Sequence, residues 1–500
     1  MQRRFAQRLV PVFGVAALLV VASGSNVAAV GVGRSVGGPS AATVTGPVTG
    51  GTGKPNLIST SFDLASVGYA ANEYFLSGTA TAYSSSTPLT ADGKWSVHPA
   101  TTAPYTTRLL VYRPSNPKCF NGTVVVEWLN VSAGFDSPPD WLGAHVSMLR
   151  DGTAWVGVDA QSVGVQGGAA TVAGLPAGGL KGADPARYGS LSHPGDSYSY
   201  DIFSQAGRVV RDTARTSPLG GLPVRRVLGI GESEGAFHLV TYINAVQPRD
   251  HVYNGFLVHS RWGNGSPLSQ TPQPTISVPN GTVIRSDLKV PVLVFETESD
   301  LLQGYVLARQ PDSRWFRLWE VAGTAHADSY TTGGFGDTGD GKAEVALLDM
   351  SAVGGGPLNC SSPINDGPAF LVLNTAVHDL NRWVTAGTPP PSAPRINASP
   401  GSPVTIARDA HGNALGGIRT PLVDVPIATL DGKANRGGSF CSLFGSTAPF
   451  SPPVLATLYP SHAQYVAAFN RATRRALTAG FLVPQDAQHL EAAAAQSPVS

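Results

Sequence analysis

The stretch from Val224 to Asn244 decides the fold, and it reads Val-Arg-Arg-Val-Leu-Gly-Ile-Gly-Glu-Ser-Glu-Gly-Ala-Phe-His-Leu-Val-Thr-Tyr-Ile-Asn. It begins with a short apolar run typical of a buried strand and ends with a segment of helical character. Between the two, Gly231-Glu-Ser-Glu-Gly235 matches the pattern Gly-x-Ser-x-Gly. A serine on a tight turn needs small residues two positions away on either side, because the turn brings those positions close to neighbouring backbone. The stretch therefore predicts a strand, a turn that exposes Ser233, and a helix.

Similar strand signals lie on both sides of this stretch. Short apolar runs that predict strands occupy residues 74–76, 108–112, 122–130, 153–159, 253–259, 290–295 and 316–321. Helix-like segments lie between or after them at residues 141–149, 200–213 and 369–383. We expect the first two strands to pair antiparallel, since polar, turn-rich residues separate them. The alternation that follows predicts an α/β fold with a mostly parallel central sheet flanked by helices.

Composition places the chain among folded proteins and excludes several classes of function. Of the 500 residues, 42 % are hydrophobic, which is enough for a sizeable core. Only 13 % are charged, and 34 basic against 33 acidic residues leave a formal net charge of +1. Nucleic-acid binding needs a clustered basic surface, so we expect no nucleic-acid partner. The three cysteines form no Cys-x-x-Cys pair, and no metal site is expected.

The N-terminal residues predict export. Three arginines precede an apolar run from Leu9 to Ala22, about 14 residues against the roughly 20 that span a bilayer. Small residues follow, and Val27-Ala28-Ala29 suits cleavage. We expect a signal peptide over residues 1–29, a flexible leader over 30–56, and a mature protein that is secreted or in the cell envelope, without stable membrane insertion. The Arg-Arg pair leaves the export route open.

A proline-rich stretch divides the remaining chain. The helix-like segment 369–383 is followed by Gly387-Thr-Pro-Pro-Pro391, which stops a helix. We expect a core domain over residues 57–392. The C-terminal extension, residues 393–500, is predicted to pack on that core and to contain a helix capped by Ser461; a separate small domain is the alternative.

Several further segments resemble one family. They are Glu127-Trp-Leu-Asn-Val-Ser132, residues 187–205, His259-Ser-Arg261 and Gly416-Gly-Ile-Arg-Thr-Pro421, and with the serine turn they span about Phe62 to Val483. In these segments the chain resembles the α/β-hydrolase superfamily, and more narrowly a secreted bacterial group of α/β-hydrolase domain proteins. The resemblance implies an α/β-hydrolase fold and, as the commonest activity of the superfamily, hydrolysis of carboxylic esters. It implies no particular substrate.

A serine hydroxyl is a weak nucleophile, so it needs a base, and the base needs a carboxylate that orients it. In the α/β-hydrolase order both partners follow the serine. An apolar strand runs directly into Glu296-Thr-Glu-Ser-Asp300, where we take Asp300 as the acid and Glu298 as the alternative. His326 lies on a small-residue loop after the next strand and is the expected base. The predicted catalytic residues are therefore Ser233, Asp300 and His326.

Backbone N–H groups are expected to stabilise the oxyanion of such a reaction. One belongs to Glu234, directly after the nucleophile, and a second comes from the loop Asn130-Val-Ser-Ala-Gly134. Either Val131 or Ser132 could provide this second N–H group, and the sequence does not separate them. The acidic neighbours of the serine, Glu232 and Glu234, would disfavour anionic acyl groups unless their side chains turn aside.

These observations predict an exported serine esterase that works through an acyl-enzyme intermediate. Its substrate is expected to be a small-molecule or lipid-like ester, and the chemistry needs no metal or organic cofactor. One alternative is a cell-envelope acyltransferase that passes the acyl group to a sugar or lipid hydroxyl. The other is a non-catalytic binding protein on the same fold, against which the intact serine, aspartate and histidine argue.

The cysteines predict one disulfide. An oxidising compartment allows a single bond among three cysteines. Cys119 stands just before a buried strand, whereas Cys360 and Cys441 lie in loop-rich sequence. We therefore predict that Cys360 pairs with Cys441 and ties the extension to the core, with three free thiols as the alternative.

Overall fold

The computed structural model of the protein describes residues 42–169, 176–331, 338–342, 359–438 and 440–499. The predicted signal peptide, residues 1–29, lies outside the described residues. One nine-stranded sheet has the order β1-β2-β3-β5-β4-β8-β9-β10-β11. Its strands are β1 (Thr43–Thr45), β2 (Tyr69–Ser84), β3 (His98–Pro114), β4 (Thr123–Trp128), β5 (Ala154–Val158), β8 (Arg226–Glu232), β9 (Gly255–His259), β10 (Val292–Thr297) and β11 (Phe316–Val321).

The sheet is antiparallel at one edge and parallel elsewhere. β2 pairs antiparallel with β3, and β3 pairs antiparallel with β5. From β5 onward, through β4, β8, β9 and β10 to β11, every neighbouring pair is parallel. Parallel strands bring their carboxyl ends to one edge, so the turns after β8, β10 and β11 lie at the same edge of the sheet. The mostly parallel α/β sheet predicted from the sequence is confirmed.

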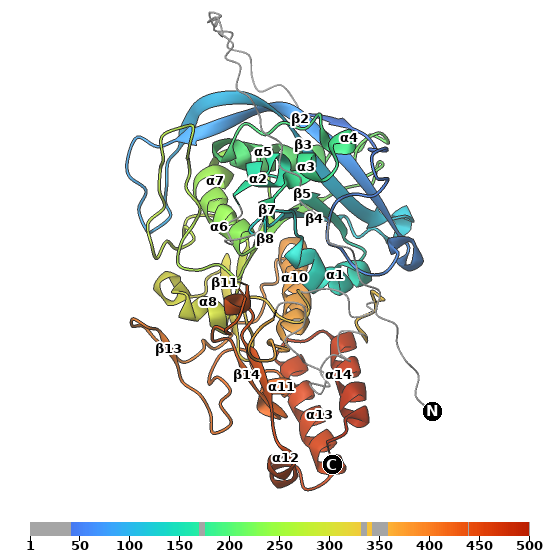
Figure 1. Ribbon diagram of the computed structural model, residues 1–500, viewed down its shortest axis with the longest axis vertical. Coiled ribbons are helices and arrows are strands. Elements are labelled where there is room, and N and C mark those ends of the chain that lie inside the picture. Colours follow the sequence, from blue (N-terminus) through green and yellow to red (C-terminus); the bar gives the residue numbers. More distant parts are fainter. Residues whose placement is uncertain (1–41, 170–175, 332–337, 343–358, 439, 500) are drawn as a thin grey trace, which may run out of the picture. The chain divides into compact units, whose positions relative to one another are not determined.

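Helices cover both faces of this sheet. The helices of the core are α1 (Pro139–Asp151), α2 (Ser162–Gln166), α3 (Gly179–Ala183), α4 (Pro185–Tyr188), α5 (Ser199–Val209), α6 (Glu234–Thr241), α7 (Gln247–Asp250), α8 (Glu298–Leu302) and α10 (Ala369–Ala386). α5 and α6 share a core cluster with Val124 and Val126 of β4, whereas α1 and α10 share another with Val125. α1 and α10 lie side by side (Figure 1). Successive strand residues point to opposite faces, so a strand covered on both faces is a continuous apolar run. None of the described helices is both long and apolar enough to cross a membrane.

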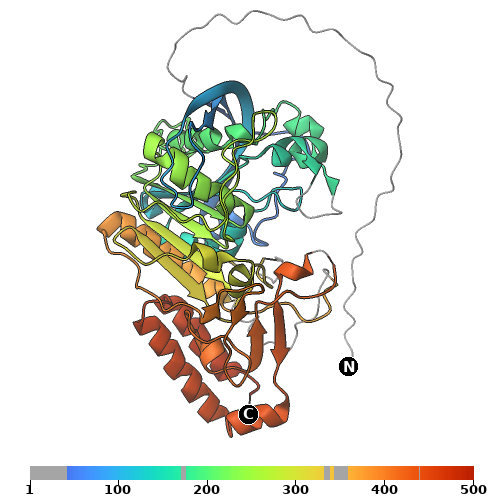
Figure 2. The ribbon, with the colours of Figure 1, turned by 90° about the vertical axis from the view of Figure 1, so that its left-hand side faces the viewer.

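The C-terminal extension packs beside β11. Ile418 forms a parallel bridge with Val321, and its N–H donates to the Glu320 carbonyl at 2.7 Å. The ring of Phe481 packs edge to face on Trp319 of β11. Figure 2 shows the red helices of the extension beneath the yellow strands β10 and β11. The extension contains β12 (Ala398–Ser399), β13 (Thr405–Ile406), α11 (Pro421–Asp424), β14 (Ala428–Asp431), β15 (Ser446–Pro449), α12 (Pro452–Leu458), α13 (His462–Thr478) and α14 (Pro484–Gln496).

The described part of the expected leader, residues 30–56, is ordered. β1 pairs antiparallel with β2, which extends the sheet by one edge strand. The buried guanidinium of Arg187 donates to the carbonyl oxygens of Gly50 at 2.7 Å and Val48 at 3.2 Å. The prediction of a flexible leader is therefore wrong from residue 42 onward. A glycine- and threonine-rich segment without periodicity is held here by backbone hydrogen bonds, which its own sequence does not reveal.

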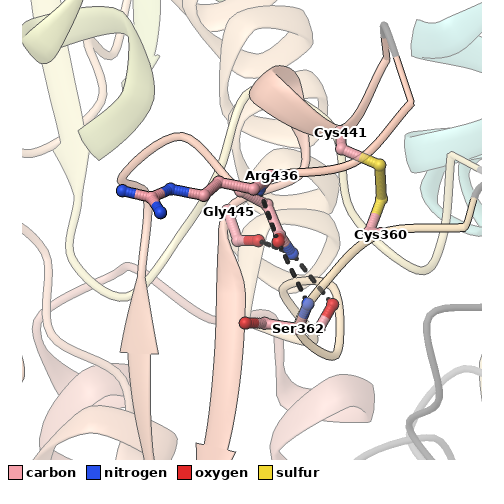
Figure 3. The surroundings of a disulfide bond; sticks show 6 residues. Cys360, Ser362, Arg436, Cys441 and Gly445 are labelled. Carbon is pink, nitrogen blue, oxygen red and sulfur yellow. Dashed lines mark hydrogen bonds between the residues drawn. A yellow bond between two sulfur atoms is a disulfide. The ribbon is translucent and has the colours of Figure 1, made fainter.

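Cys360 and Cys441 form the disulfide predicted from the sequence, with their Cα atoms 5.4 Å apart (Figure 3). Next to it, the side-chain amide of Asn435 donates to the carbonyl oxygens of Ser362 at 2.9 Å and Gly445 at 2.8 Å. Cys119 is an exposed free thiol. The bond thus links the end of a core loop to the extension.

Candidate active site

Ser233 occupies the turn between β8 and α6 and has a strained backbone. Its φ of 54° and ψ of −115° lie outside the regions that L-residues prefer. Two glycines permit this turn: a Cβ on Gly231 would lie 2.9 Å from the carbonyl carbon of Gly235, and a Cβ on Gly235 would lie 2.7 Å from the Trp128 oxygen. The Ser233 N–H donates to the His259 carbonyl at 3.0 Å, which anchors the turn to β9. The local pattern folds as its sequence predicts.

The serine hydroxyl faces an imidazole that a carboxylate holds from the other side. His326 Nε2 lies 2.8 Å from Ser233 Oγ, and His326 Nδ1 lies 2.7 Å from Asp300 Oδ1. Asp300 is fixed in turn by Thr297, whose N–H and hydroxyl donate to Oδ2 at 2.8 and 2.6 Å. The turns after three parallel strands therefore bring the three predicted residues into one chain of hydrogen bonds.

Glu298, the alternative acid, contacts different partners. Its Oε1 accepts from the Gly323 N–H at 2.6 Å, and its Oε2 accepts from Arg408 Nη2 at 2.9 Å. Within the described part of the chain, no hydrogen bond or ion pair joins Glu298 to His326. Asp300 is the carboxylate that contacts the imidazole, whereas Glu298 ties the loop before His326 to the extension.

The charges around His326 favour its protonated form. Burial lowers the pKa of the imidazole, but the carboxylates of Asp300 and Glu232 and the hydrogen bond to Asp300 outweigh burial and raise the pKa to about 9. Burial raises the pKa of Glu232 to about 7, against the opposing effect of His326 and His259. An imidazole with a high proton affinity is a strong base toward the serine hydroxyl.

The two candidate sources of the second oxyanion donor differ in their hydrogen bonds. The Ser132 N–H donates to Asn130 Oδ1 at 2.9 Å and is already used. Among the hydrogen bonds of the described residues, the N–H of Val131 has no acceptor. The N–H of Glu234 stands at the first position of α6, where a helix provides no acceptor of its own. The geometry therefore favours Val131 over Ser132 as the partner of Glu234.

The two glutamates beside Ser233 are held in different ways. Glu234 turns aside: its carboxylate accepts from Ser132 Oγ at 2.7 Å and from Gln161 Nε2 at 2.8 Å. Glu232 stays at the site, where its Oε1 lies 3.4 Å from His326 Nε2. Of the two acidic neighbours, only Glu232 therefore has its carboxyl group next to the imidazole.

A second histidine–aspartate pair lies beside the site, and the sequence interpretation missed it. His259 Nδ1 is 2.9 Å from Asp140 Oδ1, and both side chains are buried. Asp140 lies in the first turn of α1, and its N–H donates to Glu127 Oε1 at 2.9 Å. The available signal was the position of His259 at the end of β9. Glu232, the neighbour of Ser233, ends the adjacent strand β8, so His259 is expected to lie near Ser233. Nothing in the sequence singles out Asp140 as its partner.

An aromatic side chain adjoins the imidazole on the loop after β9. The ring of Trp262 lies 6.2 Å from the ring of His326 and packs edge to face on Phe237 of α6. His238, on the same helix, points elsewhere: it stacks on Trp128 with ring centroids 4.8 Å apart. Trp262 therefore provides apolar surface next to Ser233 and His326.

Comparison with known proteins places this site in a family. Several solved structures resemble parts of the chain, among them the following two. A lidless α/β serine hydrolase from Xanthomonas campestris has 12 % identity and a TM-score of 0.26, over 43 % of this chain and 78 % of its own. A fungal esterase from Rhizomucor miehei has 11 % identity and a TM-score of 0.30, over 66 % of this chain and 93 % of its own. No curated protein matches the chain. The alpha/beta hydrolase domain matches residues 44–492, and the chain therefore belongs to the alpha/beta hydrolase domain family.

Proposed function

We propose that the protein is a serine hydrolase that cleaves carboxylic esters through an acyl-enzyme intermediate. The observation that carries this proposal is the chain of hydrogen bonds from Ser233 Oγ through His326 to Asp300, at 2.8 and 2.7 Å. A hydroxyl, an imidazole and a carboxylate in this order act as nucleophile, base and orienting group.

In the acylation step, Ser233 Oγ bonds to the ester carbonyl carbon while its proton passes to His326 Nε2. The carbonyl oxygen becomes an oxyanion, which the N–H groups of Glu234 and Val131 stabilise. The C–O bond to the alcohol then breaks, and the alcohol leaves with the proton from His326. A water molecule repeats the sequence on the acyl-enzyme, which releases the carboxylic acid and restores Ser233. Asp300 keeps the ring oriented throughout.

We also propose that the enzyme acts outside the cytoplasm, secreted or in the cell envelope, on small-molecule or lipid-like esters. The disulfide between Cys360 and Cys441 supports an oxidising compartment. The buried carboxylate of Glu232 next to His326 supports neutral or cationic acyl groups over anionic ones, since a like charge there is repelled.

The test is Ser233→Ala, assayed with p-nitrophenyl acetate and with a fluorophosphonate probe. We expect ester cleavage to fall to the uncatalysed background and labelling to disappear, because only the nucleophilic oxygen is lost. Ser461→Ala is the matched control, since Ser461 caps α13 away from the site. Most of the activity retained by a normally folded Ser233→Ala protein would contradict the proposal.

A further inference from the structure

The Nε2 nitrogen of the His326 imidazole lies close to two side-chain oxygen atoms. It is 2.8 Å from Ser233 Oγ and 3.4 Å from Glu232 Oε1. Asp300 occupies the other ring nitrogen, Nδ1. In the proposed mechanism a single carboxylate, that of Asp300, orients the histidine. Glu232 is therefore a fourth charged group to which the proposed reaction assigns no role.

Glu232 is held in this place by its surroundings. It is the last residue of β8, its side chain is 8 % exposed, and Asn130 Nδ2 donates to its Oε2 at 3.3 Å. Among the residues that the structure describes, no arginine or lysine lies within ion-pair distance of Glu232. The cation available to its charge is therefore a protonated His326.

The other titratable groups that act on Glu232 come from four neighbouring elements. His259 ends β9 and is hydrogen-bonded to Asp140 in the first turn of α1. Asp300 lies in the first turn of α8, directly after β10, and His326 follows β11. The two histidines favour the ionised form of Glu232, and the two aspartates oppose it. Of the two histidines in the described structure, only His326 lies within 4.0 Å of the Glu232 carboxylate.

We propose that Glu232 is a positioning residue for His326, a second carboxylate that stabilises the imidazolium both in the resting enzyme and in the transition state. The inference rests on the proposed function, because the interaction affects a rate only if His326 takes a proton during the reaction. In the resting enzyme, Glu232 and Ser233 compete for the Nε2 side of the ring. In the transition state the ring has taken the serine proton, and both carboxylates stabilise it.

A stabilised imidazolium gives the reaction a characteristic dependence on pH. Burial lowers the pKa of His326, but Asp300 and Glu232 raise it to about 9, and the free enzyme must lose this proton before the ring can act as a base. Below that pH the resting ring and the ring in the transition state both carry the proton. Removal of Glu232 destabilises both equally, so the rate does not change. Above that pH the resting ring is neutral, so removal of Glu232 destabilises only the transition state and lowers the rate.

The experiment measures the rate at which a fluorophosphonate probe labels Ser233 from about pH 5 to about pH 10 in the wild-type and Glu232→Gln proteins. We expect the variant to reach its plateau about one pH unit lower and about tenfold slower, while the rates on the acidic side superimpose. Glu491→Gln is the matched control, because the Glu491 carboxylate lies on α14 and accepts from Arg474 instead of contacting the imidazole. Its profile should keep the wild-type midpoint.

Two results would overturn the inference. One is a Glu232→Gln profile with the wild-type midpoint, and the other is a uniform fall at every pH, which a purely structural role would produce. If Glu232→Gln does not fold, Glu232→Ala removes the same charge and carries the same expectation. Hydrolysis of p-nitrophenyl acetate, followed in parallel, separates the two proposals. Labelling without ester cleavage contradicts the proposed function alone, and a shifted labelling profile still supports the role of Glu232.

Discussion

The core and the C-terminal extension contribute to the candidate site in different ways. The core provides the atoms that would react, on turns after β8, β10 and β11. The extension contacts the same turns through other groups: Arg408 pairs with Glu298, and Leu443 accepts from the Ala327 N–H at 3.0 Å. Arg408 lies 110 residues beyond Glu298 in the chain. In this protein, a local motif provides the reacting groups, and a distant segment fixes the loops that carry them.

The largest effect is expected at α8, which carries both Asp300, the residue that contacts His326, and Glu298, the residue that pairs with the extension. Asp300→Asn should lower kcat for p-nitrophenyl acetate by on the order of 10³ to 10⁴, because the amide no longer orients the imidazole correctly. Glu298→Gln removes a charge that pairs with Arg408 and leaves the Asp300–His326 contact in place, so its loss should be far smaller. Steady-state kinetics of both variants check this. The reverse order of effects would move the acid two residues upstream.

The next largest effect concerns the covalent link between the two regions. Cys360→Ser with Cys441→Ser opens a loop of sequence separation 81 and should lower the free energy of unfolding by about 4 kcal/mol on the chain-entropy account. Urea unfolding measures the loss, and Cys119→Ser, at an exposed free thiol, is the control. A double variant as stable as the control would show that the extension is held without the bond.

The smallest effect is expected at the ion pair between the two regions. Arg408→Ala leaves the fully buried Glu298 carboxylate without its cation. Loss of one partner from a buried pair costs about 3 to 5 kcal/mol, and we expect about 2 to 3 here because the Arg408 side chain is 24 % exposed. Thermal unfolding checks this figure, and Arg408→Lys should recover part of the loss. If Arg408→Ala is as stable as the wild type, the pair does not hold the extension to the turn.

Much of the fold follows from local patterns. The apolar runs at 122–130 and 153–159 predicted buried strands because both faces of β4 and β5 are covered by helices. Gly231 and Gly235 predicted a tight turn because no larger residue fits next to the backbone of Trp128 and of the turn itself. Residues 42–56 were missed, because their order depends on pairing with β2 and on Arg187, both of which lie outside the segment.

Local sequence patterns were enough to predict the α/β class, the turn at Ser233, and the order in which serine, acid and histidine follow successive strands. These features depend on periodicity and on residue size, which are local properties. The packing of distant segments decided that Asp300 rather than Glu298 contacts His326. Among the described residues it also left the N–H of Val131 without an acceptor, whereas the N–H of Ser132 has one. It also decided that Glu232 stays beside the imidazole. The direction of a side chain at a strand end depends on the groups packed against it, and here those groups come from distant segments of the chain.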